Sequence, residues 1–432
     1  MRVHCLVLAL FTSTGGAAAL AQESPGARAP APPLSLAQAV REAGEAHPAL
    51  EAARQDAAAL HARPAAERAL PAPMLDARIW RWPISTLNPG NVDMYMFMVQ
   101  QELPGRGKRA VREGAALRDA EAASAAADAR VWDVVTTVKQ AYATLRALRR
   151  EIAATGALLP VVTDLIEASE LAYASGRDAQ VSVVRATLQR SRLEERLAAL
   201  RGEERVAEAV LNRAIGRDPA RPVGPLDPVP ALPPLAPLEA MWSQAAVQHP
   251  ELTVARAEAR AGDAAVDVAR AERRPDWVVE GGYMLMPGEA GAWSARVGIT
   301  WPDAPWARPR VTAALAEADA RRQAADARVR ARQLDLAGEL AEAHRAIEAL
   351  EARLAVVRGT LQPQAAHFAE AARLAFAAGQ APLADVLDAH EAALEIEVDD
   401  ARLTGALERA WAELERAVGR DLVLEEARSW SR

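Results

Sequence analysis

Apolar side chains recur every seven residues through two long stretches of this chain. The first series consists of Val131, Val138, Leu145, Ile152, Leu159, Ile166 and Tyr173. The second series consists of Leu340, Ile347, Leu354, Leu361 and Phe368. A seven-residue apolar repeat that persists this far is typical of helices that supercoil around partner helices. We therefore predict long helices over residues 106–173 and 308–376.

Four shorter segments alternate between apolar and polar residues, as strands with two different faces do. These predicted strands are 74–83, 92–103, 276–286 and 292–301. In the last of them one face would carry Trp293, Ala295, Val297, Ile299 and Trp301, and the other Ser294, Arg296, Gly298 and Thr300. Such alternation, with tryptophans near the strand ends, is typical of a membrane barrel. The alternative interpretation is a small soluble sheet with one buried face.

Four strands are too few to close a barrel by themselves. Open sheet edges are not tolerated in the hydrocarbon core of a membrane, because their N–H and C=O groups would lack partners. Two copies of the chain would give eight strands, whose interior is filled by side chains, whereas three copies would give twelve and leave a passage. Strands that enter a membrane therefore require an oligomer, and a channel favours more than two copies.

The chain contains one unit that occurs twice. The segment HPALEAAR (His47–Arg54) matches HPELTVAR (His249–Arg256) in the second half. We place the first repeat at 34–218 and the second at 238–424, joined by a proline-rich linker at 219–237. Each repeat is expected to hold a helix, a strand pair, the long helix and a return helix. The remaining helices are predicted at 36–70, 179–215, 238–273 and 383–418.

Composition narrows the class of protein further. The net charge is −7, and this acidic balance argues against a general nucleic-acid binder. Residues 1–21 have the pattern of a secretory signal, with Arg2, an apolar run and a small-residue cleavage site; a membrane anchor is the alternative. Residues 22–33 are expected to be disordered. The single cysteine, Cys5, lies in the signal, so disulfides and cysteine catalysis are excluded from the mature chain.

We find no motif that predicts an enzyme, a cofactor site or a metal site. There is no nucleophile–base pair, zinc motif or phosphate-binding loop, and no later apolar run is long enough for a transmembrane helix. The segment GRGKRA imitates a dinucleotide-binding fingerprint, but no strand–helix–strand unit surrounds it. His47 and His249 each precede a proline, and we expect them to be structural.

The repeat, the strand pairs that interrupt long helices, the glycine turns and the motif DVLDA (Asp385–Ala389) together resemble the outer-membrane efflux protein family, the TolC-like channels. The segment QQELPGRGKR (Gln100–Arg109) is similar to the heavy-metal efflux branch. The resemblance implies a mainly α-helical chain whose homotrimer forms a twelve-stranded barrel in the outer membrane of a Gram-negative bacterium, continued by a helical tunnel across the periplasm.

The same resemblance implies a passive duct that receives substrate from a periplasmic adaptor protein and an inner-membrane pump. Heavy-metal cations are one candidate cargo. The alternatives are an outlet of a type I protein secretion system and, in a different class, a periplasmic coiled-coil adaptor or scaffold. This chain departs from the family pattern in its short C-terminal tail and in having no lipidated N-terminal cysteine.

Asp385 and Asp388 are the candidate periplasmic gate, because DVLDA carries the aspartate rings of the tunnel mouth in the family. Three copies would bring six carboxylates to a constriction, where like charges repel and favour cations. An ordinary acidic pair near a helix start is the alternative. The candidate adaptor contacts are the two helix–helix turns, Tyr173 with Gly176 and Phe376 with Gly379, since glycine permits the left-handed backbone of a tight turn.

Two further groups of residues are candidates. Six of the eight methionines lie in the predicted strands and share parity with the polar, lumen-facing set: Met74, Met94, Met96, Met98, Met284 and Met286. Thioethers suit soft ions such as copper(I), and apolar filling is the alternative. The basic cluster at the start of the first long helix is expected to contact anionic lipid headgroups: Arg106, Lys108, Arg109 and Arg112.

Overall fold

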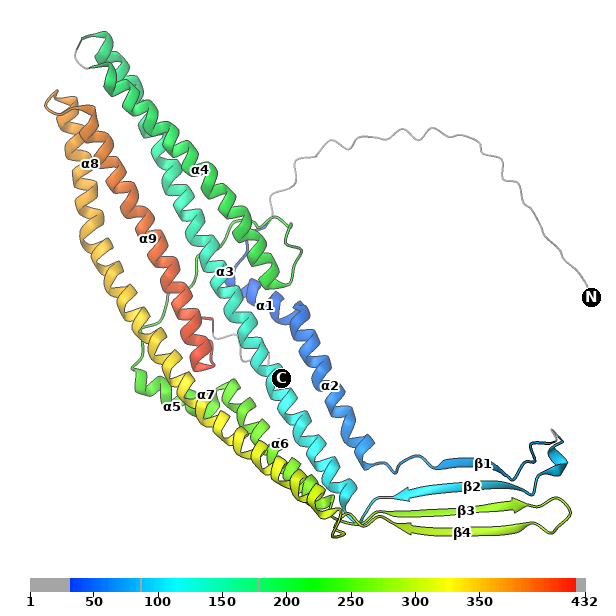
Figure 1. Cartoon of the computed structure of the whole chain (residues 1–432). Helices are drawn as coiled ribbons and strands as arrows, with labels where there is room; N and C mark the ends of the chain where they lie inside the picture. Colours follow the sequence, from blue (N-terminus) through cyan, green and yellow to red (C-terminus); the bar gives the residue numbers. More distant parts are fainter. Residues whose placement is uncertain (1–31, 86–87, 177–178, 425–432) are drawn as a thin grey trace, which may run out of the picture.

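The computed structural model describes residues 32–85, 88–176 and 179–424, and both halves of the chain show one order of elements (Figure 1). The first half contains α1 (Leu36–Ala46), α2 (Pro48–Arg68), β1 (Met74–Trp80), β2 (Met94–Leu103), α3 (Lys108–Ala174) and α4 (Gln180–Ile215). The second half contains α5 (Leu238–Gln248), α6 (Pro250–Ala271), β3 (Trp277–Leu285), β4 (Ala292–Ile299), α7 (Arg308–Val356), α8 (Gln362–Ala377) and α9 (Leu383–Val418). The predicted signal at 1–21 lies outside the described residues.

The sequence predicts one helix over 36–70 and one over 238–273, and this prediction is wrong in the same way at both places. Each helix is divided at a histidine that precedes a proline. The residue before proline is pushed out of the α region, and His47 has an extended backbone with φ −71° and ψ 121°. Its ring Nδ1 accepts a hydrogen bond from Ala49 N at 3.1 Å, so the histidine caps the next helix. His249 does the same for Glu251 N at 3.2 Å.

The second long helix is also interrupted, which the heptad pattern does not predict. A π-helical segment, Val357–Leu361, separates α7 from α8. Pro363 follows this segment at the start of α8. Its ring cannot donate a backbone hydrogen bond and clashes with the carbonyl of Gly359, four residues earlier. A wider turn next to Pro363 avoids that clash, whereas α3 continues as an α-helix past Pro160.

The helix α3 is the axis of the helical body. Among the described residues it is the one helix that is long and apolar enough, by length and composition alone, to cross a membrane. Its 67 residues extend about 100 Å, roughly three times the thickness of a bilayer's hydrocarbon core. The helices α2, α4, α6 and α9 pack against α3 along its length (Figure 1). Four helices are therefore held in place by one.

The four strands form one antiparallel sheet in the order β1-β2-β3-β4, which extends away from the ends of the helices (Figure 1). Phe97 lies opposite Ala77 on one side and Tyr283 on the other, so the apolar residues share a face as predicted. That face is open: Phe97 is 54% exposed, Val297 65% and Trp293 82%. A soluble sheet buries its apolar face. The exposed apolar face therefore argues against the soluble alternative.

A strap formed by the linker 219–237 crosses α3 and closes the core of the first half. Leu34 N donates to Pro225 O at 2.8 Å, and Asp227 N donates to Leu34 O at 3.1 Å. The hydroxyl of Tyr142, on α3, lies 2.9 Å from Leu34 O and 2.7 Å from Asp227 O. Burial raises the pKa of Tyr142 to about 12, so the hydroxyl keeps its proton. One side chain thus holds the strap and the N-terminal segment together.

We predict that Tyr142→Phe lowers the free energy of unfolding of the helical body by about 1 kcal/mol, because a buried carbonyl loses its donor. The measurement is thermal unfolding of the purified protein followed by circular dichroism. Tyr173→Phe is the matched control, since Tyr173 is exposed at the end of the same helix. Equal melting temperatures for Tyr142→Phe and the control would contradict the role given to the hydroxyl.

Candidate functional site

The two helical hairpins, α3–α4 and α8–α9, turn at the same end of the molecule, far from the sheet (Figure 1). Each turn contains a glycine with a left-handed backbone, Gly176 at φ 71° and Gly379 at φ 68°. Gly176 N donates to Tyr173 O at 2.9 Å, and Gly379 N donates to Phe376 O at 3.0 Å. These are the turns that the sequence predicts, and we call them the hairpin tips.

The surroundings of the hairpin tips are open. A Cβ atom added to Gly176 or Gly379 would meet no atom of the described residues within 4 Å. Tyr173 is exposed, whereas Phe376 is half-buried against the apolar cluster beneath the tips. Small residues with free space around them allow another protein surface to approach the turn closely. The geometry is therefore compatible with a docking contact made by backbone and small side chains.

Asp385 and Asp388 lie on the first turns of α9, immediately behind one hairpin tip. Both carboxylates are exposed, while the neighbouring side chains of Val386 and Leu387 are buried. No ion pair or side-chain hydrogen bond of either aspartate is found within residues 32–85, 88–176 and 179–424. The N-cap of α9 is Pro382, without a side-chain cap. The two acids thus do not cap the helix and remain available to a channel mouth.

An apolar cluster joins the two hairpins just below the tips. Leu383 and Leu387 of α9 pack with Leu158 and Val162 of α3 and with side chains of α4. All four of these residues are less than a tenth exposed. This contact fixes the position of the start of α9 relative to the first hairpin. It thereby also positions Asp385 and Asp388.

Farther from the tips, the hairpins are joined by charge. Asp400 of α9 binds Arg150 of α3 at 2.8 Å (Oδ2 to Nη2) and Arg358 of the π-helical segment at 2.5 Å (Oδ1 to Nε). Burial would raise the pKa of Asp400, but the guanidinium groups of Arg358 and Arg150 hold it below the usual value. One buried carboxylate therefore ties the interruption of the second long helix to α3.

More buried acids follow the same pattern, and the sequence analysis did not identify them. Glu151 of α3 binds Arg196 of α4 at 3.1 Å and Arg402 of α9 at 2.8 Å. Further pairs between α3 and the C-terminal part of the chain are Arg146 with Glu408, Lys139 with Glu415 and Lys139 with Asp421. The available signal was Asp400, Glu408 and Glu415, acids spaced seven or eight residues apart on one helix.

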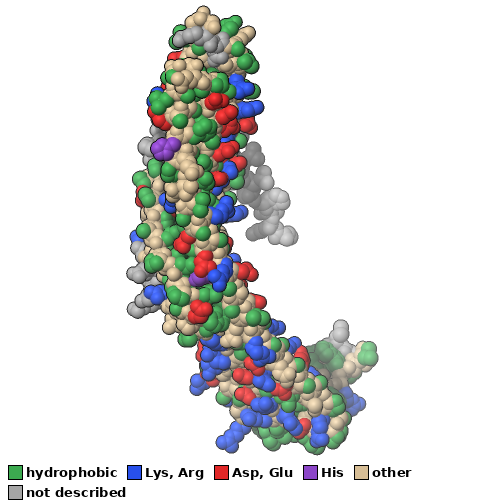
Figure 2. Space-filling view, turned by 90° about the vertical axis from the view of Figure 1, so that its left-hand side faces the viewer, with side chains coloured by type: hydrophobic (Ala, Val, Ile, Leu, Met, Phe, Trp, Pro, Cys, Tyr) green, Lys and Arg blue, Asp and Glu red, His purple; other side chains and the backbone are tan. Residues whose placement is uncertain are grey.

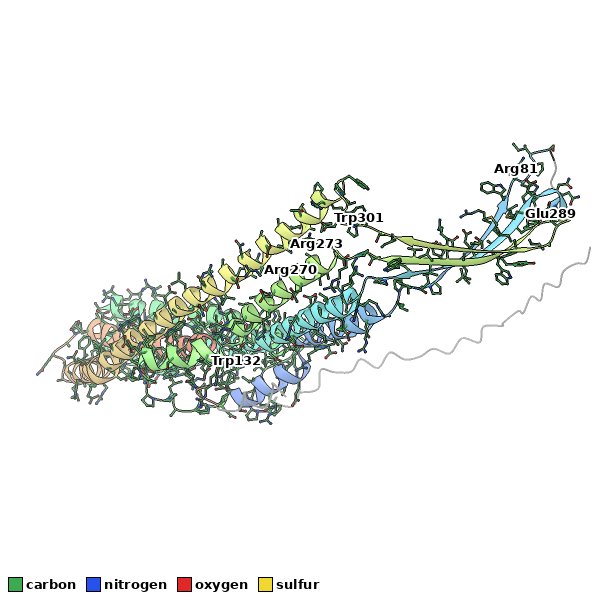
Figure 3. All side chains as sticks on the ribbon, turned by 90° about the horizontal axis from the view of Figure 1, so that it is seen from below. Arg81, Trp132, Arg270, Arg273, Glu289 and Trp301 are labelled. Carbon is green, nitrogen blue, oxygen red and sulfur yellow. The ribbon has the colours of Figure 1, made fainter. Side chains whose placement is uncertain are left out.

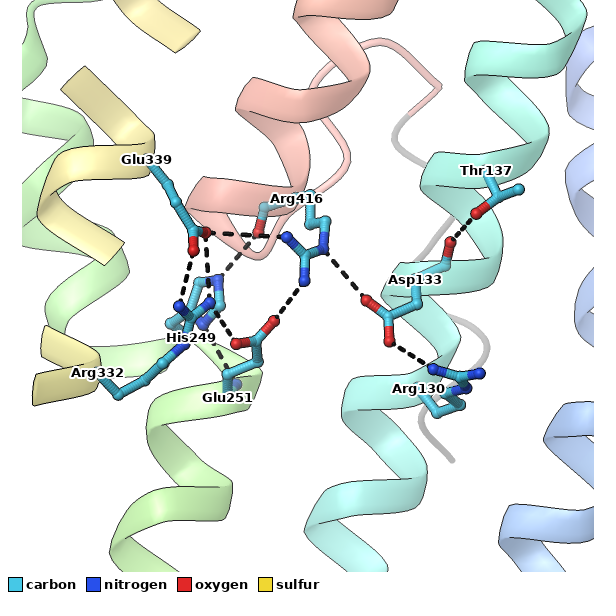
Figure 4. A network of polar contacts seen from close by, with 8 residues as sticks. All are labelled: Arg130, Asp133, Thr137, His249, Glu251, Arg332, Glu339 and Arg416. Carbon is cyan, nitrogen blue, oxygen red and sulfur yellow. Dashed lines mark hydrogen bonds and ion pairs between the residues drawn. The ribbon is translucent and has the colours of Figure 1, made fainter. Parts of the chain in front are cut away.

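The densest network lies where α9 ends, and it connects four helices (Figure 4). Arg416 of α9 binds Asp133 of α3 at 3.2 Å and Glu251 of α6 at 2.9 Å. Arg332 of α7 binds Glu251 and, at 2.7 Å, Glu339. The ring Nε2 of the buried His249 lies 2.9 Å from the carbonyl oxygen of Arg416. Burial lowers the pKa of His249, which favours the neutral ring that caps α6.

The prediction that the basic cluster binds lipid is wrong for the buried Lys108, and for the half-buried Arg112 it stays a prediction. Lys108 is only 1% exposed, and its Nζ lies 2.8 Å from Asp276 and 3.2 Å from Glu272. Arg112 binds the same Glu272 at 2.5 Å. These residues hold the start of α3 to the end of α6 and the start of β3. Their partners are more than a hundred residues away in the sequence, so no local sequence pattern predicts these ion pairs.

Of the other two members of the cluster, Arg109 uses its side chain within the chain, whereas Arg106 is exposed and contributes only its backbone carbonyl. Arg109 Nη1 donates to the carbonyl oxygen of Arg68 at 2.9 Å, and the carbonyl oxygen of Arg106 accepts from Arg274 Nη1 at 2.8 Å. Lys and Arg side chains gather on the lower part of the helical body in Figure 2. The exposed arginines close to the sheet in the sequence are Arg106, Arg273, Arg274, Arg308 and Arg310.

The methionines of the strands share one sheet face with polar residues. Met96 lies opposite Arg78 on β1 and Met284 on β3. Met98 lies opposite Asp76 and Gly282 on the same strands. No group of three or more His, Cys, Asp and Glu side chains that could hold a metal ion is present in the part of the chain that the structure describes.

Comparison with known proteins decides which family has this fold. A model of the outer membrane efflux protein family matches residues 39–217 and 241–420. The chain belongs to this family. The two matched segments lie within the predicted repeats 34–218 and 238–424, whose boundaries stay a prediction. A comparison with curated proteins found no match.

Solved structures of outer-membrane channels have the same fold. The channel OprN is 20% identical with a TM-score of 0.75, and the match covers 92% of this chain and 91% of that one. VceC of Vibrio cholerae is 21% identical with a TM-score of 0.73, covering 90% and 96%. CmeC of Campylobacter jejuni is 14% identical with a TM-score of 0.76, covering 92% and 89%. At these identities the likeness shows a shared fold.

Family membership places this efflux protein in the outer membrane, with its helical body extending into the periplasm. The predicted resemblance to the family is thereby confirmed. The alternative of a periplasmic adaptor or scaffold is wrong, because the matched family is that of the outer-membrane component.

The pKa of Asp400 gives a prediction for the pH dependence of stability. Its folded-state pKa lies below the ordinary value of 3.8, so its ion pairs stabilise the fold above that pH. The contribution disappears as the pH falls through the lower, folded-state value. Asp400→Asn should reduce the free energy of unfolding at pH 7 by about 1–3 kcal/mol and flatten its decline below pH 4, as measured by unfolding at several pH values.

Glu370→Gln is the control for Asp400→Asn. Glu370 also has a pKa lowered by an arginine, Arg373, but this pair is fully exposed on α8. Exposed pairs contribute little to stability because water and salt screen them. If both variants showed the same pH profile as the unchanged protein, the coupling role of Asp400 would be refuted.

Proposed function

We propose that three copies of this chain form the passive outer-membrane exit channel of a tripartite efflux system. The observation that carries the proposal is the sheet with an exposed apolar face and two unpaired edges, on β1 and β4. Lipid covers such a face, and edge-to-edge pairing between copies satisfies the outer backbone groups. Four strands from each of three chains give twelve, enough to leave a passage through the barrel.

The dimensions of the sheet support its place in a membrane. The strand β2 has ten residues, which extend about 33 Å, close to the thickness of a hydrocarbon core. Exposed tryptophans lie where the sheet meets the helices, namely Trp277, Trp301 and Trp306. Charged residues lie at the opposite end, where Figure 3 shows Arg81 and Glu289 beside the strand-connecting turns. Aromatic residues at the membrane–water interface and charges beyond it are typical of barrel strands.

The helical body then forms the wall of the periplasmic duct. Its hairpin tips lie at the end farthest from the sheet, where a periplasmic adaptor and an inner-membrane pump would meet the channel. The open space at Gly176 and Gly379 supports adaptor docking there. The chain carries no motif for an energy-yielding reaction, so the pump supplies the driving force. No observation on the described residues favours the alternative cargo, a secreted protein.

The exposed aspartates make the tip end a cation-selective constriction. In a trimer, Asp385 and Asp388 contribute six carboxylates around one axis, and their mutual repulsion is relieved by cations in the lumen. The apolar cluster behind them fixes their position. A heavy-metal cation is the cargo that we favour, because the methionines lie on the polar sheet face, which turns to the lumen of a closed barrel.

The gate proposal predicts the electrical behaviour of the channel. Asp385→Ala together with Asp388→Ala should raise single-channel conductance in planar bilayers, because the smaller alanine side chains widen the constriction. The preference for cations should fall several-fold, because the constriction loses its negative charge. Conductance and reversal potential in a salt gradient are the measurements.

The matched control is Asp164→Ala together with Glu167→Ala. These two exposed acids have the same spacing on α3, in the other hairpin. The control should leave selectivity unchanged. If the Asp385 and Asp388 variant conducted and selected ions like the unchanged protein, these residues would not form the constriction.

The docking proposal predicts a local steric effect. Asparagine tolerates a left-handed backbone, so Gly176→Asn and Gly379→Asn should keep the turns while adding a side chain to the tips. We expect at least tenfold weaker binding to the cognate adaptor in a pull-down titration, with trimer formation intact. Gly288→Asn is the control, because Gly288 also has a positive φ and open surroundings but lies between β3 and β4. Unchanged adaptor affinity in both tip variants would exclude the tips as the contact.

A further inference from the structure

Four methionines form a compact array on the polar face of the sheet. Met96 on β2 is the direct cross-strand neighbour of Met284 on β3. Met94 precedes Met96 by two residues, and Met286 follows Met284 by two, directly after the end of β3. Tyr95 pairs with Leu285, so the next residues along the two antiparallel strands, Met94 and Met286, lie opposite each other. All four side chains therefore leave the same face of two adjacent strands.

The spacing of this array suits a common ligand. Directly opposed residues have Cβ atoms about 5 Å apart, and residues two apart on one strand are separated by about 7 Å. Methionine has three rotatable bonds, so four thioethers that start from a rectangle of this size can converge on one point. All four side chains are half-buried even in a single chain, whereas Met74, near the other end of the sheet, is 61% exposed.

The distribution of methionine argues against simple apolar filling. The apolar face of the same sheet uses leucine, valine, isoleucine, phenylalanine, tyrosine and tryptophan, and no methionine of the four strands lies on it. Within the described helices, Met241 is the one methionine, in a buried core position. If the chain needed only apolar volume beside the polar residues, the leucine and valine used elsewhere would serve.

The charges near the array are already neutralised within the sheet. Arg78, which lies beside Met96, binds Asp76 at 2.9 Å. Arg296 on β4 binds Glu280 on β3. A monovalent cation among the thioethers would therefore not face an uncompensated arginine. Hard divalent cations would find no carboxylate within the array itself, and they prefer oxygen ligands.

We propose that Met94, Met96, Met284 and Met286 form a binding site for a monovalent soft cation, copper(I) or silver(I). Neutral thioethers are the ligands that such ions select. As a path for cargo the site rests on the proposed channel, because only a closed barrel turns this face toward a lumen. Binding itself does not depend on conduction. A thioether carries no proton to lose when the ion binds. Uptake and release of the ion therefore do not depend on the protonation of the ligands.

Silver(I) is the probe, because it resists oxidation in air. The mature protein, without the predicted signal and its Cys5, is purified in detergent micelles, titrated by calorimetry in chloride-free buffer at pH 7 and then examined by X-ray absorption at the silver edge. We expect saturable binding and silver–sulfur scattering for the unchanged protein. Met96→Leu with Met284→Leu should weaken the affinity at least tenfold, and the fourfold leucine variant should lose the sulfur shell. An excess of zinc(II) should not displace silver(I).

Met241→Leu is the matched control, since this methionine lies in the helical core and should leave the titration unchanged. Leucine is close to methionine in volume, and trimer formation and bilayer conductance of each variant show that the barrel is intact. The proposal is overturned if the unchanged protein takes up no silver(I), or if the fourfold variant binds as tightly as the unchanged protein. If the silver site is overturned but the unchanged protein still conducts ions, the proposed channel function is unaffected. If the protein binds silver(I) but does not conduct ions, only the channel function is refuted.

Discussion

Unpaired backbone groups at the two edges of a four-stranded sheet are the constraint on which this structure depends. In water the sheet exposes an apolar face that includes Phe97, Val297 and Trp293. In lipid that face is favourable, but each unpaired N–H or C=O at an edge costs several kcal/mol. Several such groups on each edge cost far more than the entropy lost when chains associate. The proposed channel therefore requires β1 of one copy to pair with β4 of another.

The helical body solves a different problem, because it must keep long helices in register with few large side chains. Alanine is abundant along α3, and α9 comes close to α3 at Gly405, where an added Cβ would lie 2.6 Å from Ala147. Helices so close leave little apolar volume between them. Register is set instead by buried carboxylates, Glu151 and Asp400, each held by two arginines. Removing one partner of such a group leaves a buried charge, so a shifted register is costly.

Periodicity in the sequence predicts the elements well where one physical rule acts alone. The heptads predict α3 over 106–173, and the structure has Lys108–Ala174. Alternation predicts all four strands, and the register places the methionines on the polar face. The errors arise where two rules compete. At His47 and His249 the restriction before proline prevails over helix periodicity. Before Pro363 the second long helix widens into a π-helical segment, which α3 lacks at Pro160.

Contacts between distant segments are the part that local patterns cannot supply. The sequence places Lys108 in a basic cluster, but its partners Glu272 and Asp276 come from the other half of the chain. Asp385 and Asp388 could be found because a family motif carries them, whereas Asp400 has no motif and acquires its role from Arg150 and Arg358. A charged residue in a predicted helix is expected to be exposed unless its oppositely charged partner is known. The partner can be identified only from the three-dimensional structure.

The distribution of these contacts also divides the helical body mechanically. Toward the sheet, Arg416 and Arg332 connect four helices through three carboxylates, and the start of α3 is held by Lys108. Toward the hairpin tips, the two hairpins share the apolar cluster around Leu383 and Leu387. Asp400 stands between these regions, at the π-helical segment that interrupts the second long helix. If the proposed gate opens by a displacement of the tips, the ion pairs of Asp400 are therefore the first charged contacts between the hairpins to oppose it, and the sheet end can stay fixed while the tip end moves.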